Sequence, residues 1–143
     1  MKRDGGLAWT YVESSAILEW LLAQPDAAVV QAELAAARRL VTSHLTLLGC
    51  ARAIARTAGS QQAQAQASLR ALATTLELAP IDLDLLDPLG RPFAIEPVRT
   101  LDAIHLCTAA RLRSLQEKVG FLTLDGRVRS NAAAMGFAVL PER

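Results

Sequence analysis

Aromatic residues make up only 4% of this chain, cysteine occurs twice, and no segment approaches the roughly 18 apolar residues that a membrane span requires. The first residues are basic but lack the apolar core and cleavage site of a signal peptide. Cys50 and Cys107 both lie in helical patterns, which favours free thiols over a disulfide. A net charge of +1 gives no whole-protein field for nucleic acid. We expect a cytoplasmic protein without a membrane segment.

Alanine dominates what is present. Hydrophobic residues reach 52% of the 143 residues, with only eight glycines and six prolines, a balance that favours helices around a proper core. The length suits a single domain over residues 1–143, and there is no internal repeat.

Short apolar segments alternate with segments of helical spacing along the chain. Strands are predicted at 8–12, 39–42, 78–83, 120–124 and 137–140. Helices are predicted at 14–24, 26–37, 43–58, 61–77, 100–116 and 127–135, with a proline-rich loop over 84–98. Ser14 or Ser15, Ser43 and Thr100 are the expected N-caps. This alternation predicts an α/β fold, with a parallel sheet of about five strands covered on both faces.

Two acids directly follow predicted strands, where ligands of parallel sheets bind. Asp125 ends a strand and begins a turn with Gly126, so it is either a turn residue or part of a site. Thr123 points to the same side of the strand and could hold a metal-bound water. Glu13 either belongs to the same site, caps the helix that follows, or pairs with an arginine, because a buried charge needs partners.

Asp102 lies in the first turn of a predicted helix, where an acid also favours the helix dipole without any further role. His105 shares its face, and is either a packing residue or a ligand. In the helix from Ser43, Gly49 stands on one stripe with Arg52 and Arg56. A mid-helix glycine costs roughly 1 kcal/mol relative to alanine, so either close packing or evolutionary drift explains it; we favour drift.

Four stretches together resemble the PIN-domain family, and its VapC-like toxin ribonucleases most of all. They are Tyr-Val-Glu-Ser-Ser-Ala (11–16), Ser-His-Leu-Thr-Leu-Leu-Gly-Cys-Ala-Arg (43–52), Arg-Thr-Leu-Asp-Ala-Ile-His (99–105) and Phe-Leu-Thr-Leu-Asp (121–125). The resemblance implies a three-layer α/β/α domain and an endoribonuclease that uses Mg²⁺ or Mn²⁺. It also implies a toxin silenced by a small antitoxin, and a homodimer.

The same resemblance implies residue roles. Glu13, Asp102 and Asp125 would be the catalytic metal ligands, Ser15 and Thr123 would support them, and Arg52 would contact the acids or the RNA phosphate. The family normally has Asp where Glu13 stands and Glu where Gly49 stands. Glu96 is the nearest substitute for the missing acid.

These departures predict weakened or lost ribonuclease activity. The alternative is a non-catalytic module that keeps the fold to bind an antitoxin, itself or RNA. An unrelated nucleotide-binding domain ranks last, because no glycine-rich phosphate loop follows any predicted strand.

Overall fold

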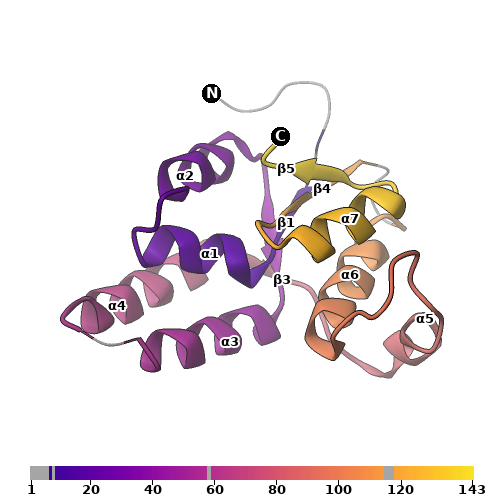
Figure 1. Cartoon of the computed structure of the whole chain (residues 1–143), viewed down its shortest axis with the longest axis horizontal. Helices are drawn as coiled ribbons and strands as arrows, with labels where there is room; N and C mark the ends of the chain where they lie inside the picture. The colour runs from indigo at the N-terminus through magenta and orange to yellow at the C-terminus, as the bar shows by residue number, and fades with distance from the viewer. Residues whose placement is uncertain (1–6, 8, 58, 115–117) are drawn as a thin grey trace.

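Five parallel strands form one sheet in the order β3-β2-β1-β4-β5 (Figure 1). The computed structural model describes residues 7, 9–57, 59–114 and 118–143. The strands are β1 (Trp9–Val12), β2 (Leu40–Thr42), β3 (Glu77–Leu78), β4 (Val119–Leu122) and β5 (Ala138–Leu140). The helices are α1 (Ser14–Leu21), α2 (Ala27–Ala36), α3 (His44–Ala55), α4 (Gln61–Ala73), α5 (Leu86–Leu89), α6 (Thr100–Leu112) and α7 (Gly126–Ala134), with a 3₁₀ turn η1 (Leu83–Leu85) before α5.

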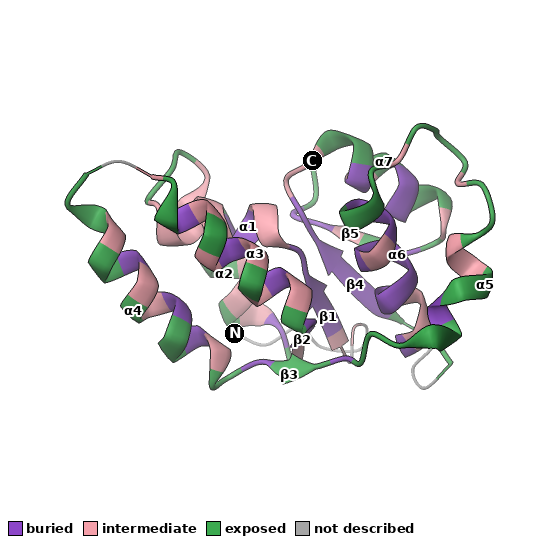
Figure 2. Ribbon diagram, turned by 90° about the horizontal axis from the view of Figure 1, so that it is seen from below, coloured by how far each residue is buried: buried purple, intermediate pink, exposed green. Residues whose placement is uncertain are grey.

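Each face of the sheet has its own apolar core, because side chains alternate along the strands. Val12 and Leu122 pack with α1 to α4 on one face. Tyr11 and Phe121, one position earlier in each strand, pack with α6 and α7 on the other. Figures 1 and 2 show α1 to α4 on one side of the sheet and α5 to α7 on the other. The predicted three-layer α/β fold is confirmed.

The helix starts differ in part from prediction. Ser43 caps α3 as expected, and its hydroxyl accepts from the Thr46 amide at 3.4 Å. The N-cap of α1, however, is Glu13 rather than Ser14 or Ser15, and its carboxylate accepts a hydrogen bond from the Ser15 amide. Arg99, rather than Thr100, is the N-cap of α6, and its side chain makes no capping bond.

The third strand is much shorter than the predicted 78–83. After the Ala79 amide donates to the Thr42 carbonyl at 2.7 Å, the chain leaves the sheet. Pro80 has no amide hydrogen with which to continue the ladder. The segment 84–98 is mostly loop, as expected, with α5 as its one short helix in the described chain. The helices predicted to 77 and 116 end earlier, at Ala73 and Leu112; positions 8, 58, 115 and 116 of the predicted elements lie outside the described residues.

Within the part of the chain that the structure describes, no helix combines the length and apolar character needed to cross a membrane. Cys50 and Cys107 are free and buried, as the sequence predicts, and burial raises the pKa of the Cys50 thiol to about 12. A thiol with so high a pKa is almost entirely protonated at neutral pH, so Cys50 is a packing residue rather than a nucleophile.

Candidate functional site

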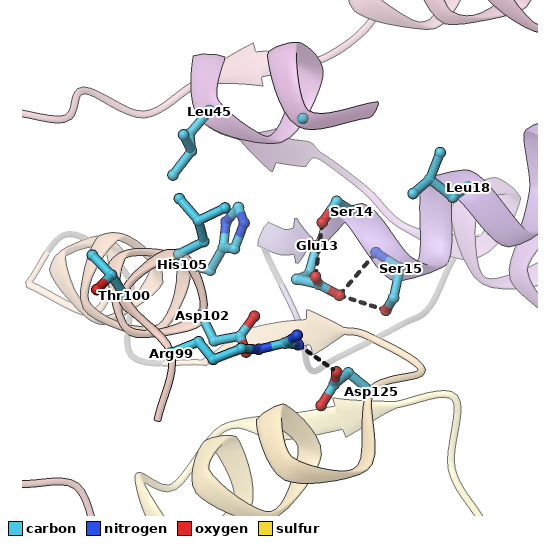
Figure 3. Close-up of a pocket in the computed structure, with 12 residues that line it drawn as sticks. Glu13, Ser14, Ser15, Leu18, Leu45, Arg99, Thr100, Asp102, His105 and Asp125 are labelled. Atoms are coloured by element: carbon cyan, nitrogen blue, oxygen red, sulfur yellow. Dashed lines mark hydrogen bonds and ion pairs between the residues drawn. The ribbon is translucent and has the colours of Figure 1, made fainter. Parts of the chain in front are cut away.

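A pocket of about 410 Å³ opens at the carboxyl edge of the sheet (Figure 3). It brings together segments that are far apart in the sequence: the residues after β1, one face of α3, the start of α6 and the residue before α7. Its lining comprises Glu13, Ser14, Ser15, Leu18, Leu45, Gly49, Arg99, Thr100, Leu101, Asp102, His105 and Asp125. The three predicted acids and the glycine therefore lie around one cavity.

Glu13 is the most buried of the acids, with 4% of the residue exposed. Its Oε1 accepts from the Ser14 hydroxyl at 2.9 Å. Its Oε2 accepts from the Ser15 amide at 3.0 Å, from the Ser15 hydroxyl, and from the Thr123 hydroxyl at 2.8 Å. These donors offset the cost of burying the charge. Of the roles that the sequence left open for Glu13, the structure shows the helix cap, and Ser15 and Thr123 hold the carboxylate in place.

Asp102 and Asp125 have a different kind of partner. One guanidinium spans both: Arg99 Nε donates to Asp102 Oδ2 at 3.1 Å, and Nη2 donates to Asp125 Oδ2 at 3.4 Å. The hydrogen bond to Asp102 raises the pKa of Arg99 above its usual value. The other oxygen of Asp125 caps α7, accepting from the amides of Arg127 and Val128 at 3.0 and 3.1 Å.

Sequence reasoning missed Arg99 as a site residue. The available signal was its spacing: a residue three positions before an acid at a helix start lies on the same side of the helix. Its reach to Asp125, 26 residues further along the chain, depends on the packing of α6 against α7 and could not be read from the sequence.

Gly49 lines the pocket without being needed for packing. A Cβ added there would have no neighbouring atom within 4 Å. Close packing therefore does not explain this mid-helix glycine, and a larger side chain at position 49 would have room.

Two other residues that the sequence analysis considered for the site, Arg52 and Glu96, do not line the pocket. Arg52 is exposed on α3, and neither it nor Arg56 belongs to the pocket lining. Glu96 is occupied within its own loop, where it accepts from the amides of Phe93 and Val98 at 3.0 and 2.8 Å. Glu96 does not replace the acid missing at position 49.

Beneath the acids lies a buried polar network centred on His105. Its Nδ1 lies 2.9 Å from the Tyr11 hydroxyl and 3.3 Å from the Thr46 hydroxyl, and the Tyr11 hydroxyl also donates to Ser43 Oγ at 3.3 Å. Burial lowers the pKa of His105, and burial raises the pKa of Tyr11. His105 is thus a neutral packing residue that joins β1, α3 and α6, although its side chain also borders the pocket.

The donor set has the chemistry of a site for a hard divalent cation, because Mg²⁺ prefers carboxylate and water oxygens. The placement of these groups is less favourable. Among the described residues, no three His, Cys, Asp or Glu side chains are gathered closely enough to hold one ion. Glu13 is engaged by protein donors, and Arg99 stands between the two aspartates. Asp102 and Asp125, which share Arg99, are the acids that an ion would reach if the guanidinium moved aside.

The chain is an α/β protein with a parallel sheet, and its acidic pocket lies at the carboxyl ends of the strands, where ligands of such sheets bind. A sequence profile of the PIN domain matches residues 10–133, and the chain belongs to the PIN-domain family. It is 36% identical to Ribonuclease VapC46 of Mycobacterium tuberculosis over 135 residues. The matched segment covers 94% of this chain and 98% of that protein.

Solved structures at lower identity share the fold. FitAB bound to an IR36 DNA fragment superposes with a TM-score of 0.65 at 17% identity, covering 92% of this chain and 93% of that one. Mycobacterium tuberculosis VapC20, a sarcin-ricin loop cleaving toxin, superposes with a TM-score of 0.62 at 19% sequence identity. The match covers 90% of this chain and 95% of that one. VapBC-5 of the same organism, a member of the VapBC family of toxin–antitoxin systems, superposes with a TM-score of 0.58 at 23% sequence identity. The match covers 92% of this chain and 95% of that one.

Proposed function

We propose that this chain is a VapC-type toxin endoribonuclease whose activity depends on a divalent ion and is weakened by the loss of one acid. The observation that carries the proposal is the meeting of Glu13, Asp102 and Asp125 around one pocket in a chain 36% identical to a VapC ribonuclease. The fold alone would support many activities.

In this proposal Glu13, Asp102 and Asp125 would hold Mg²⁺ or Mn²⁺. If bound there, the ion would supply Lewis-acid chemistry for phosphodiester cleavage, namely activation of a water and stabilisation of the leaving oxygen. Ser15 and Thr123 fix the Glu13 carboxylate through their hydroxyls. Arg52 is exposed one turn beyond Gly49, outside the pocket lining, so contact with RNA outside the pocket is the role that remains for it.

The activity should be weak for two physical reasons. Position 49 supplies no carboxylate, which removes a charge and an oxygen ligand from the pocket. The Glu13 carboxylate already accepts hydrogen bonds from three residues of its own chain. These bonds compete with an ion for the carboxylate oxygens and lower the affinity of Glu13 for it. Displacements of about 1 Å in such a site can cost on the order of 100-fold in rate.

The partners follow from the same family. We propose that a small antitoxin binds and silences this chain, that the chain forms a homodimer, that its substrate is RNA, and that it works in the cytoplasm. The support is the relationship to VapC46 and the likeness in fold to toxins of VapBC systems.

A second candidate is a non-catalytic PIN-fold module that binds an antitoxin, itself or RNA. The observation that favours it is that all three acids already have partners in the chain itself: hydroxyls and an amide for Glu13, and the Arg99 bridge for the two aspartates. A module that never binds an ion would keep its acids paired in this way.

Cleavage of a fluorescent RNA in Mn²⁺ or Mg²⁺, with and without EDTA, separates the two candidates. The ribonuclease proposal predicts slow cleavage that EDTA abolishes and that Asp102→Asn abolishes as well. Because Asp102→Asn is purified in the same way, it controls for contaminating nucleases. Cleavage that survives both EDTA and Asp102→Asn would contradict the proposal, and no cleavage together with tight antitoxin binding would favour the module.

A further inference from the structure

Arg99 occupies the place between two acids that a bound cation would need. Its guanidinium bonds to Asp102 at 3.1 Å and to Asp125 at 3.4 Å, one nitrogen to each carboxylate. The three side chains differ sharply in exposure: 79% for Arg99, 11% for Asp102 and 29% for Asp125. The acids are thus mostly covered by the fold, whereas most of the Arg99 side chain lies in solvent. Figure 3 shows Arg99 beside Asp102 and Asp125.

The backbone that carries Arg99 is fastened to α7, the helix that Asp125 caps. Buried Asn131 accepts from the Ile95 amide and donates to the Ile95 carbonyl, both at 3.0 Å. Arg127 donates to the Pro97 carbonyl at 2.6 Å. These contacts fix the start of the Arg99 side chain near the two aspartates, and 79% of that side chain is exposed to solvent.

We propose that Arg99 is a resident cation of this site, which holds Asp102 and Asp125 together in the metal-free protein and which a divalent ion must displace in order to bind. The inference rests on the proposed function in assuming that these acids are ligands. A guanidinium and a divalent ion cannot share the position between the same oxygens, so the affinity for the ion is set in part by how readily Arg99 leaves.

Displacement is feasible because of where Arg99 lies. Ion pairs of exposed side chains are weak, and a long arginine side chain gains rotamer freedom when it is released. The amide and hydroxyls around Glu13 offer no such exit, since Ser14, Ser15 and Thr123 are fixed in the helix start and the strand end. An ion would therefore take over the aspartate side of the pocket first.

Mn²⁺ titration calorimetry tests the proposal on Arg99→Gln, Arg99→Lys and the wild type. Arg91→Gln is the matched control, because Arg91 is an exposed arginine in the loop before α6 and lies outside the pocket lining. We expect Arg99→Gln to bind Mn²⁺ roughly five- to tenfold more tightly than Arg91→Gln, the size expected for two ion pairs of this kind. Arg99→Lys should fall in between, because an ammonium keeps the charge but lacks the fork that spans two carboxylates.

Melting in EDTA provides a second reading that needs no metal. Arg99→Gln leaves two aspartates without their shared counter-ion, so it should melt below Arg91→Gln in EDTA and gain more than wild type from added Mn²⁺. Equal Mn²⁺ affinity for Arg99→Gln and Arg91→Gln, including no binding by either, would overturn the proposal.

The two failures are distinguishable. If Arg99→Gln binds Mn²⁺ more tightly but no variant cleaves RNA, the resident-cation proposal stands and the proposed function fails. If wild type cleaves RNA in an EDTA-sensitive way and Arg99→Gln binds no better than Arg91→Gln, the function stands and the role of Arg99 is wrong.

Discussion

The two sides of the pocket hold their acids by opposite means. On one side Glu13 is buried and bonded to an amide and three hydroxyls that belong to the helix start and the strand end. On the other side Asp102 and Asp125 share one arginine that is mostly in solvent. The comparison teaches that burial alone does not mark a ligand. In our proposal Glu13, with its fixed neutral donors, also stabilises the fold, and the two aspartates, with a removable partner, would be the first acids to reach an ion.

The largest expected effect comes from rebuilding the two corners that depart from the family. Glu13→Asp together with Gly49→Glu should raise the metal-dependent ribonuclease rate by on the order of 10- to 100-fold, because the new carboxylate at 49 enters open space on the pocket wall. An RNA-cleavage assay in Mn²⁺ measures it. The control is Glu13→Asp with Gly49→Gln, which adds the same bulk without the charge.

The same double variant can break the account. If wild type already cleaves RNA in an EDTA-sensitive way and the rebuilt protein is no faster, three acids are sufficient and the site is not degenerate. The variant should unfold no more easily than wild type without metal, since replacing a mid-helix glycine contributes a few tenths to about 1 kcal/mol.

Removing Glu13 tests whether its side of the pocket is structural. Glu13→Ala should lower the free energy of unfolding by about 2–3 kcal/mol, because the Ser15 amide and the Ser15 and Thr123 hydroxyls lose a charged acceptor. Urea denaturation in EDTA measures the change. Glu142→Ala, an exposed acid near the end of the chain, should stay within about 0.5 kcal/mol of wild type. A loss at Glu13 as small as the loss at Glu142 would contradict the structural role.

The buried histidine beneath the acids should make the fold sensitive to acid. Burial lowers the pKa of His105 in the folded state, so the unfolded chain takes up its proton first as pH falls through about 6.5. The stability that neutral His105 contributes is present above that pH and is lost as pH falls toward its lower folded-state pKa.

Melting temperatures across this pH range in EDTA should therefore fall less for His105→Gln than for wild type. His44→Gln, a change at an exposed histidine, should follow wild type. Parallel curves for wild type and His105→Gln would show that His105 does not titrate as its burial requires.

The smallest effect is expected at Arg52. Because Arg52 is exposed and outside the pocket lining, Arg52→Gln should change Mn²⁺ affinity by less than about twofold, as for surface charges screened by solvent. Calorimetry beside Arg99→Gln gives the comparison. A change at Arg52 as large as that at Arg99 would mean that α3 supplies the controlling cation.

Local pattern predicted that Glu13 and Asp125 lie at the same edge of the sheet, the resemblance to the PIN-domain family added Asp102, and packing decided how the three acids are held. Glu13 and Asp125 follow strands that the parallel register places side by side, and Asp102 begins a helix packed beside them. The hydroxyl donors of Glu13 could not be predicted, because Thr123 reaches it only through the pairing of β1 with β4. Arg99 was hidden for the same reason, since its second partner lies on another helix. The short β3 could have been predicted from Pro80, which ends the ladder at that edge.

A crystal grown with Mn²⁺ and examined by anomalous diffraction tests the central claim most directly. The account predicts one ion bound by Asp102 and Asp125 near Glu13, with the Arg99 guanidinium turned away from both aspartates. An ion absent at saturating Mn²⁺, or bound elsewhere while Arg99 still bridges Asp102 and Asp125, would contradict it.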